Sequence, residues 1–152
     1  MTTVTWRGLD EPRMEIARVQ LGGADMRASG TQIGVGYELH YELAPDVLRL
    51  EIVGDRSVDV SLDDADFFDL GNSPLFNSLP VIRDGLLCGG PPHDYSMRWV
   101  SVPELEVSEQ RQRYEPLPDK VVRFTSGDFV AEIRFGEDGL VDFYPALAER
   151  MA

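Results

Sequence analysis

The sequence predicts an all-β protein built on one strongly curved antiparallel sheet, which forms a barrel or half-barrel with little helix. Residues 33–43 alternate apolar and polar side chains without a break, and this period of two is expected for a strand with one buried face. Similar short segments recur along the chain between turn-forming residues, a spacing typical of antiparallel barrels and sandwiches. Because a sheet of many strands must hide its edges, we expect it to close or nearly close.

The N-terminal part is expected to give two strands. Residues 2–9 form the first, with Trp6 as its largest apolar side chain, and residues 13–21 form the second. In the second strand the apolar side chains change parity, which predicts a bulge near Ala17. Gly22 to Asp25 supply the turn that follows.

The central segment, residues 33–43, is expected to be one long strand. Gly34 and Gly36 leave its polar face bare, which predicts a bend or bulge where the sheet curls. Residues 48–52 and 58–62 alternate in the same way, and we expect them to form the next two strands as a hairpin.

Residues 63–90 are the irregular part of the chain, because their dense apolar residues keep neither helical nor strand spacing. We expect a buried, turn-rich excursion with one short helical turn. Further strands are expected at residues 95–99, 105–107, 110–114, 120–125, 129–135 and 140–144, followed by a short C-terminal helix at residues 145–151.

The composition indicates a single β-barrel-like domain spanning residues 1–152. The chain has 14 Lys and Arg residues against 27 Asp and Glu residues, a net charge of −13. Charge of this sign repels phosphate backbones, so binding to nucleic acid is not expected. No apolar run approaches the roughly 20 residues of a transmembrane segment. The first residues lack the basic and apolar regions of a signal peptide, which predicts a cytoplasmic location. Self-association as a homodimer is left open.

Residue types that carry catalysis are sparse in this chain. His40 lies between two glutamates on a polar strand face, so its ordinary interpretation is a solvated residue. Cys88 and His93 lie in a Gly-Pro loop without the signature of a nucleophilic pair, and a lone cysteine is most often a buried apolar side chain. The acidic residues between positions 55 and 69 lack the spacing of a calcium loop. We therefore expect no catalytic residues, no metal site and no cofactor.

Several short motifs occur in one order along nearly the whole chain: Trp6–Asp10, Gly54–Asp59, Asp69–Gly71, Asn77–Val81, Met97–Val100, Val102–Pro103, Gln112–Tyr114, Asp138–Asp142 and Tyr144–Pro145. Together they resemble a bacterial family described as "putative glycolipid-binding". The resemblance implies an antiparallel β-barrel-like fold, similar in architecture to bacterial carriers of lipoproteins and glycolipids. It implies a glycolipid-binding role by analogy of architecture. Residues 60–68 are a shorter connection than the family pattern has, which predicts an open barrel or a smaller cavity.

The leading hypothesis is non-enzymatic binding of a lipid or glycolipid in an apolar barrel lumen, because aromatic residues occur on nearly every expected strand. Burial of an acyl chain gains about 0.8 kcal/mol per methylene, so a modest lumen suffices. The residues expected to line the lumen are Trp6, Tyr37, Trp99 and Tyr144, with Asn77, Arg98 and Tyr114 as polar anchors.

Two alternatives from other functional classes stay open. One is a small enzyme acting on an apolar substrate, with His40 or His93 as its base. The other is a packed protein-interaction module without a ligand, which recruits a partner along an exposed strand edge near Pro103.

Overall fold

The computed structural model describes residues 1–22 and 25–151, so the turn predicted at residues 22–25 lies partly outside the described residues. Its strands are β1 (Thr2–Gly8), β2 (Met14–Gln20), β3 (Arg27–Gly34), β4 (Tyr37–Leu43), β5 (Val47–Ile52), β6 (Arg56–Ser61), β7 (Phe67–Leu70), β8 (His93–Val100), β9 (Val107–Leu117), β10 (Val121–Ser126), β11 (Phe129–Phe135), β12 (Val141–Tyr144) and β13 (Ala148–Met151). The helix α1 (Pro74–Arg83) and the 3₁₀ turn η1 (Leu86–Cys88) lie between β7 and β8.

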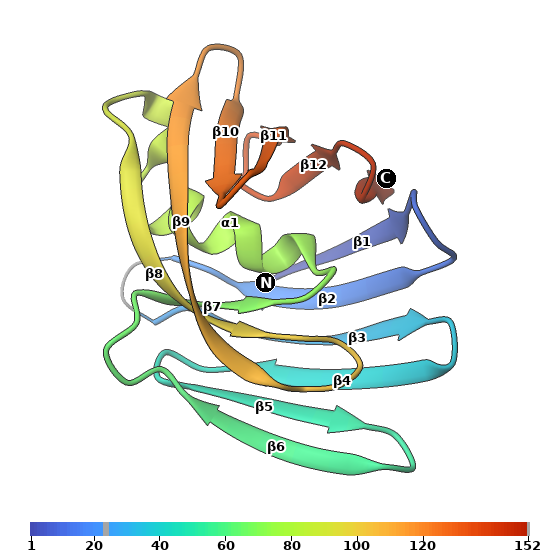
Figure 1. Cartoon of the computed structure of the whole chain (residues 1–152). Helices are drawn as coiled ribbons and strands as arrows, with labels where there is room; N and C mark the ends of the chain where they lie inside the picture. Colours follow the sequence, from blue (N-terminus) through green and yellow to red (C-terminus); the bar gives the residue numbers. More distant parts are fainter. Residues whose placement is uncertain (23–24, 152) are drawn as a thin grey trace.

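All the described strands join one sheet in the order β6-β5-β4-β3-β2-β1-β13-β12-β11-β10-β9-β8-β7. Neighbouring strands are antiparallel except β7 and β8, which run parallel. Figure 1 shows the sheet curling around α1, with β6 and β7 as its two edges. The prediction of an all-β, strongly curved antiparallel sheet is confirmed, and the sheet is open. The two edge strands are the ones joined by the short connection noted in the sequence.

Side chains bridge the opening between the edge strands. The Arg56 guanidinium, at the start of β6, donates to the backbone carbonyls of Pro103 and Glu104 at 2.9 and 2.6 Å. Arg98 on β8 lies 3.4 Å from the carboxylate of Asp63, in the connection between β6 and β7. Arg56, on the edge strand β6, therefore holds the loop between β8 and β9 through hydrogen bonds to the backbone carbonyls of that loop.

Helix α1 occupies the concave side of the sheet and contacts both halves of it (Figure 1). Phe76 packs edge-on against Tyr41 of β4, with ring centroids 5.5 Å apart. On the other side, the backbone N–H of Val141 donates to Oγ of Ser78 at 3.1 Å. The helix thus fills much of the space that the sequence predicted to be an open lumen.

The prediction of a single helical turn in residues 63–90 was too short, because α1 runs for ten residues. All residues from Pro74 to Val81 are buried. A helix enclosed on every side needs no apolar stripe, and its sequence therefore lacks the 3.6-residue periodicity that marks a surface helix. Pro74 in the first turn has no hydrogen bond to lose there.

Residues 33–43 do not form one strand, which corrects the prediction for this segment. They form a hairpin between β3 and β4, with Val35 and Gly36 as its turn and Gly36 at φ +80°. In a hairpin, paired residues point to the same face, so the odd-numbered positions change from the outer to the inner face across the turn. Ile33 and Val35 are accordingly 49% and 69% exposed, whereas Leu39 is buried.

Two further predictions were wrong. The pairing of β2 with β1 and β3 runs without a bulge at Ala17, so Glu15 points inward with Ala17 and Val19 while Ile16 points outward. The segment expected to be a C-terminal helix contains β13, which pairs with β1 and β12. Backbone pairing across the sheet outweighs the weak helical tendency of that segment.

Candidate functional site

A cavity of about 490 Å³ lies between the N-terminal end of α1 and the inner face of β7–β12. The chain before the helix, from Asp69 to Ser73, forms one side of it. Residues from Ser101 to Glu104, in the loop that Arg56 holds, form another. The cavity therefore sits where the helix leaves the concave side unfilled.

Aromatic rings form one wall of this cavity. They belong to Trp99, Phe124, Phe129 and Tyr144. The rings of Phe124 and Phe129 are 6.0 Å apart between centroids, and each lies 6.5 Å from the ring of Tyr144. Phe129 is 51% exposed, whereas Phe124 and Tyr144 are buried, so Phe129 marks the mouth of the cavity.

A chain of hydrogen bonds forms a polar wall, because it links the lining residues Asn77, Asp69 and Gln110 through Tyr114 and Gln112. Asn77 on α1 donates to the hydroxyl of Tyr114 at 3.2 Å, and that hydroxyl donates to Oε1 of Gln112 at 3.4 Å. Nε2 of Gln112 then donates to Oδ2 of Asp69 and to Oε1 of Gln110, both at 2.6 Å. Because both amide hydrogens and the carbonyl of Gln112 are occupied, the orientation of each partner is fixed.

Asp69 is the buried carboxylate of the cavity lining. It is buried in the middle of β7, and this burial raises the pKa of its carboxyl to about 6, although the hydrogen bond from Gln112 opposes the shift. Among the described residues, Gln112 is the side chain that donates to this carboxylate. Oδ2 carries that hydrogen bond, which leaves Oδ1 available to the cavity.

A second buried polar cluster lies behind the chain that enters α1. Glu15 accepts hydrogen bonds from the hydroxyl of Tyr41 at 2.6 Å, from Oγ of Ser73 at 2.7 Å and from Nε2 of Gln32 at 3.2 Å. Burial raises the pKa of Glu15, and these hydrogen bonds oppose the shift. Gln32 also donates to the carbonyl of Gly71 at 3.2 Å. The cluster therefore fastens one wall of the cavity to β2, β3 and β4.

The structure brings three of the predicted ligand residues together, since Trp99, Asn77 and Tyr144 all line the cavity. Tyr114 lies behind Asn77 and contributes to the polar wall through its hydroxyl. The other three lie elsewhere: Trp6 is buried and donates to the carbonyl of Val141, Tyr37 donates to Gln32 in the Glu15 cluster, and Arg98 faces Asp63 at the opening of the sheet.

Sequence reasoning missed the buried polar residues Glu15, Gln32, Asp69 and Gln112. A signal for Glu15 was present, because it shares the parity of Ala17 and Val19 on an apolar strand face. Asp69 stands between the apolar side chains Phe68 and Leu70 in a strand that is buried at every position. A charged residue inside an apolar pattern is often held there by hydrogen bonds, and such a residue is a site candidate.

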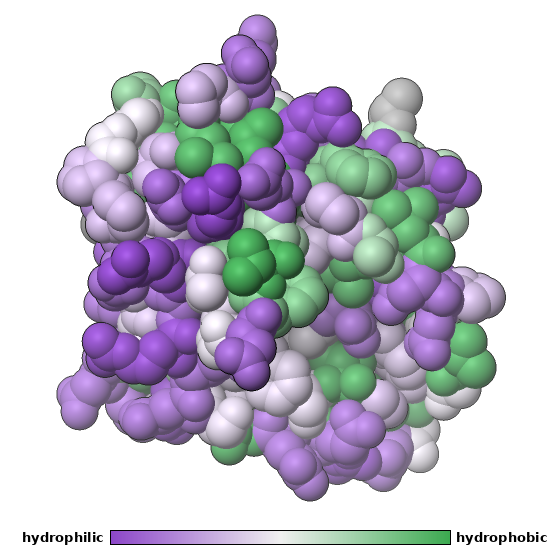
Figure 2. Space-filling view, turned by 45° about the horizontal axis from the view of Figure 1, so that its top comes forward, coloured by the Kyte–Doolittle hydropathy of each residue, from purple (hydrophilic) through white to green (hydrophobic). Residues whose placement is uncertain are grey.

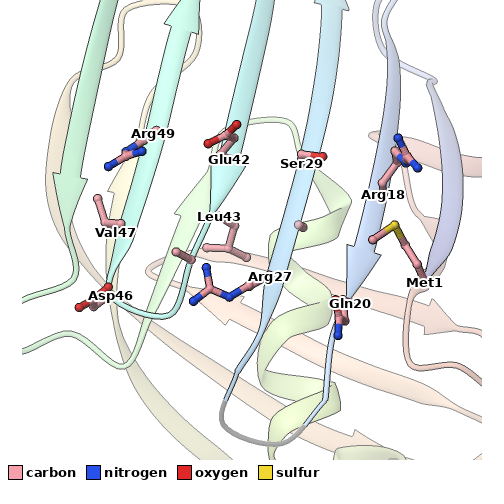
Figure 3. Close-up of a pocket in the computed structure, with 12 residues that line it drawn as sticks. Met1, Arg18, Gln20, Arg27, Ser29, Glu42, Leu43, Asp46, Val47 and Arg49 are labelled. Atoms are coloured by element: carbon pink, nitrogen blue, oxygen red, sulfur yellow. The ribbon is translucent and has the colours of Figure 1, made fainter.

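The outer face of β2–β6 carries two shallow hollows, of about 670 and 750 Å³. Figure 3 shows the first, where Arg18, Ser29, Glu42 and Arg49 project side by side from adjacent strands. Side chains of both charges stand here on an open sheet face exposed to water. Figure 2, a view onto another side of the molecule, shows small apolar patches separated by polar side chains.

The candidate bases lie outside the inner cavity. His40 borders the second outer hollow, and its Nε2 is 2.6 Å from Oε2 of Glu38. His93 stacks on Tyr95, with ring centroids 5.8 Å apart. Cys88 is exposed, which corrects the expectation of a buried thiol.

The described His, Cys, Asp and Glu side chains form no group of three suited to a metal ion. Among the described helices, none is long and apolar enough to cross a bilayer.

Two comparisons with known proteins gave a match, one with a solved structure and one with a family model. A crystal structure of a DUF1089 family protein from Pseudomonas aeruginosa superposes with a TM-score of 0.71 over 90% of this chain and 92% of that chain, at 21% identity. A likeness at this identity shows the fold alone. No curated protein matches the sequence. A family model described as "Putative glycolipid-binding" matches residues 52–150, which is more than half of the chain. The chain therefore belongs to the family described as "Putative glycolipid-binding".

Proposed function

We propose that the protein binds a lipid or glycolipid, without catalysis, in the cavity between α1 and β7–β12. The observation that carries the proposal is the pairing of an aromatic wall, formed by Trp99, Phe124 and Tyr144, with a polar wall that ends at Asp69. Such a combination of apolar surface and a few fixed polar groups is characteristic of small-molecule sites.

The size of the cavity supports this proposal. Its volume of about 490 Å³ falls within the range of roughly 300–1,000 Å³ typical of ligand pockets. Because α1 fills much of the concave side and leaves a pocket of only about 130 Å³ beside Leu79 and Arg83, the cavity suits a head group and the adjoining part of an acyl chain. The exposed ring of Phe129 at the mouth offers apolar surface to that chain.

Native mass spectrometry of the full chain, gently purified and then incubated with mixed bacterial lipids, tests the proposal. A matched pair of substitutions locates any adduct. Ser126→Trp places a large side chain in the inner cavity, and Ser29→Trp places the same side chain in the outer hollow. Tryptophan is well tolerated in strands, so both variants are expected to keep the sheet.

The expected result is a discrete adduct that solvent extraction removes, that Ser126→Trp abolishes and that Ser29→Trp retains. Identification of the extracted lipid then names the ligand class. An adduct lost only in Ser29→Trp would move the site to the outer face. An apo mass that lipid incubation does not change would refute the proposal.

A second candidate, a small enzyme acting on an apolar substrate, is favoured by one observation, the 2.6 Å contact between His40 and Glu38. A carboxylate can orient a histidine as a general base. The test is hydrolysis of a panel of acyl and glycosyl esters by the wild-type protein and by His40→Gln. Turnover that His40→Gln abolishes would support the enzyme, whereas the binding proposal expects the wild-type rate to equal the buffer rate.

A further inference from the structure

We propose that the head group bound in the inner cavity is uncharged and polyhydroxylated, a neutral glycan, and that Asp69 and Gln110 select it against phosphate-bearing head groups. This inference rests on the proposed function and names its ligand class. Three features of the cavity support it: the sign of its charge, its mixture of hydrogen-bond donors and acceptors, and its ring surfaces.

The charge of the cavity disfavours anions. None of the described residues that line it is basic, and two of them, Asp69 and Glu104, are acidic. Of the neighbouring arginines, Arg98 faces Asp63 through Nη2 while its buried Nε has no hydrogen-bond partner among the described residues, and Arg123 faces Glu115 and Glu132. A phosphate head group would lose its hydration here and meet carboxylates without a compensating cation.

The polar wall suits hydroxyl groups, each of which donates and accepts. Because Gln112 uses its amide hydrogens on Asp69 and Gln110, Gln110 accepts through Oε1 and keeps its own amide hydrogens for a ligand. Oδ1 of Asp69 offers an acceptor. Asn77 spends one amide hydrogen on Tyr114 and keeps the other. An anion would use the donors alone, whereas a row of hydroxyls uses donors and acceptors together.

The aromatic wall gives the sugar ring its other contact. An aromatic face carries partial negative charge, so it attracts the slightly positive C–H groups on the apolar face of a pyranose. Trp99 and Tyr144 lie in the same cavity as the polar wall, so one sugar ring can contact an aromatic side chain and the polar wall together. A phosphate has no such apolar face.

A buried ammonium head group is the remaining competitor. Asp69 is the one buried carboxylate of the described lining, because Glu104 is exposed. The cost of dehydrating an ammonium ion commonly exceeds the gain from a single buried partner. Hydroxyl groups exchange water for protein hydrogen bonds without that cost, so the neutral glycan is favoured over both charged classes.

Binding of four eight-carbon probes to the full chain tests this selection by titration calorimetry below their micelle concentrations. The probes are octyl glucoside, octyl phosphate, octylamine and octanol, which share one chain and differ in the head group. We expect octyl glucoside to bind at least about tenfold more tightly than each of the other three, the size of one hydrogen bond to a charged group. Equal binding of all four would overturn the inference and leave lipid binding intact. Preference for the phosphate or the amine would overturn it, and binding of none would overturn both proposals.

The change of aspartate to asparagine at two positions tests whether Asp69 is responsible for the head-group selectivity. Asp69→Asn keeps an acceptor for Gln112 but removes the charge, and Asp59→Asn makes the same change on the exposed outer face of β6. We expect Asp69→Asn to weaken octyl glucoside about tenfold and to narrow the preference over octyl phosphate, with Asp59→Asn unchanged. An Asp69→Asn variant that binds all four probes like the wild type would overturn the role of Asp69.

Discussion

Nε2 of Gln112 lies 2.6 Å from Oδ2 of Asp69. Among the described residues, Gln112 is the side chain that donates a hydrogen bond to this buried carboxylate. One hydrogen bond replaces only part of the hydration that a charged carboxylate loses on burial. Asp69 therefore costs the folded state free energy when it is ionised. An ionisable group that is buried at this cost in the lining of a cavity is a candidate functional side chain.

The first prediction concerns pH and the stability of Asp69→Asn. The pKa of Asp69 rises from 3.8 to about 6 on folding, so between these values the folded state holds more protons, and its stability falls as pH rises. A shift of this size corresponds to about 3 kcal/mol. We expect Asp69→Asn to exceed the wild type in free energy of unfolding by about 2 to 3 kcal/mol at pH 7.5, with the difference shrinking toward pH 4.

Urea unfolding of both proteins at several pH values between 4 and 7.5 measures this difference. Asp59→Asn on the outer face is the control, because its carboxylate is exposed. A difference between Asp69→Asn and the wild type that does not change with pH would contradict the assignment of the raised pKa to Asp69.

The second prediction concerns the Glu15 cluster. Glu15→Leu removes the acceptor for the hydroxyls of Tyr41 and Ser73 and leaves both buried donors unpaired. Each unsatisfied buried group costs roughly 1–3 kcal/mol, so we expect the free energy of unfolding to fall by about 3 kcal/mol or more. Glu42→Leu, on the exposed face of β4, is the matched control and should change it by about 0.5 kcal/mol or less.

Chemical denaturation at pH 7 measures both variants. Equal effects of Glu15→Leu and Glu42→Leu would show that the cluster does not hold the chain entering α1. Because Ser73 also lines the cavity, a destabilised Glu15→Leu protein is expected to lose ligand retention as well.

The third prediction concerns the opening of the sheet. Arg56→Ala removes the guanidinium that donates to the carbonyls of Pro103 and Glu104. Since Arg56 is partly exposed, we expect a stability loss of about 1 kcal/mol or less. We also expect a local effect in this loop. The amide hydrogens of Leu105 and Glu106, which donate to Ser101, should exchange faster with solvent than in the wild type.

Hydrogen exchange of the whole chain, followed by mass spectrometry, measures that local opening. Arg49→Ala is the control, since Arg49 faces Asp59 on the outer surface of the sheet. Unchanged exchange at Leu105 and Glu106 in Arg56→Ala would refute the role of Arg56 in holding the cavity wall.

The sequence was sufficient to predict the sheet but not the contents of its concave side. Alternation of apolar and polar residues is a local property, so the strands around Leu50 and Ile133 could be predicted from their own residues. The enclosure of α1 and the pairing of Gln112 with Asp69 depend on segments distant in the chain. No local pattern encodes such contacts. Aromatic character pointed to Trp99 and Tyr144, which line the cavity, but equally to Trp6 and Tyr37, which lie elsewhere.

The last prediction tests the corrected hairpin between β3 and β4. If residues 33–43 formed one strand, Ile33 would share the buried face with Leu39, and its truncation would be costly. In the hairpin, Ile33 is 49% exposed on the outer face, whereas Ile52, on the strand paired with β4, is 7% exposed. We expect Ile52→Ala to lower the free energy of unfolding by about 2–5 kcal/mol, the usual cost of a buried isoleucine, and Ile33→Ala by less than about 1 kcal/mol. Urea denaturation of the two variants, which carry the same substitution, decides between the arrangements, because equal losses would place Ile33 in the core and refute the hairpin.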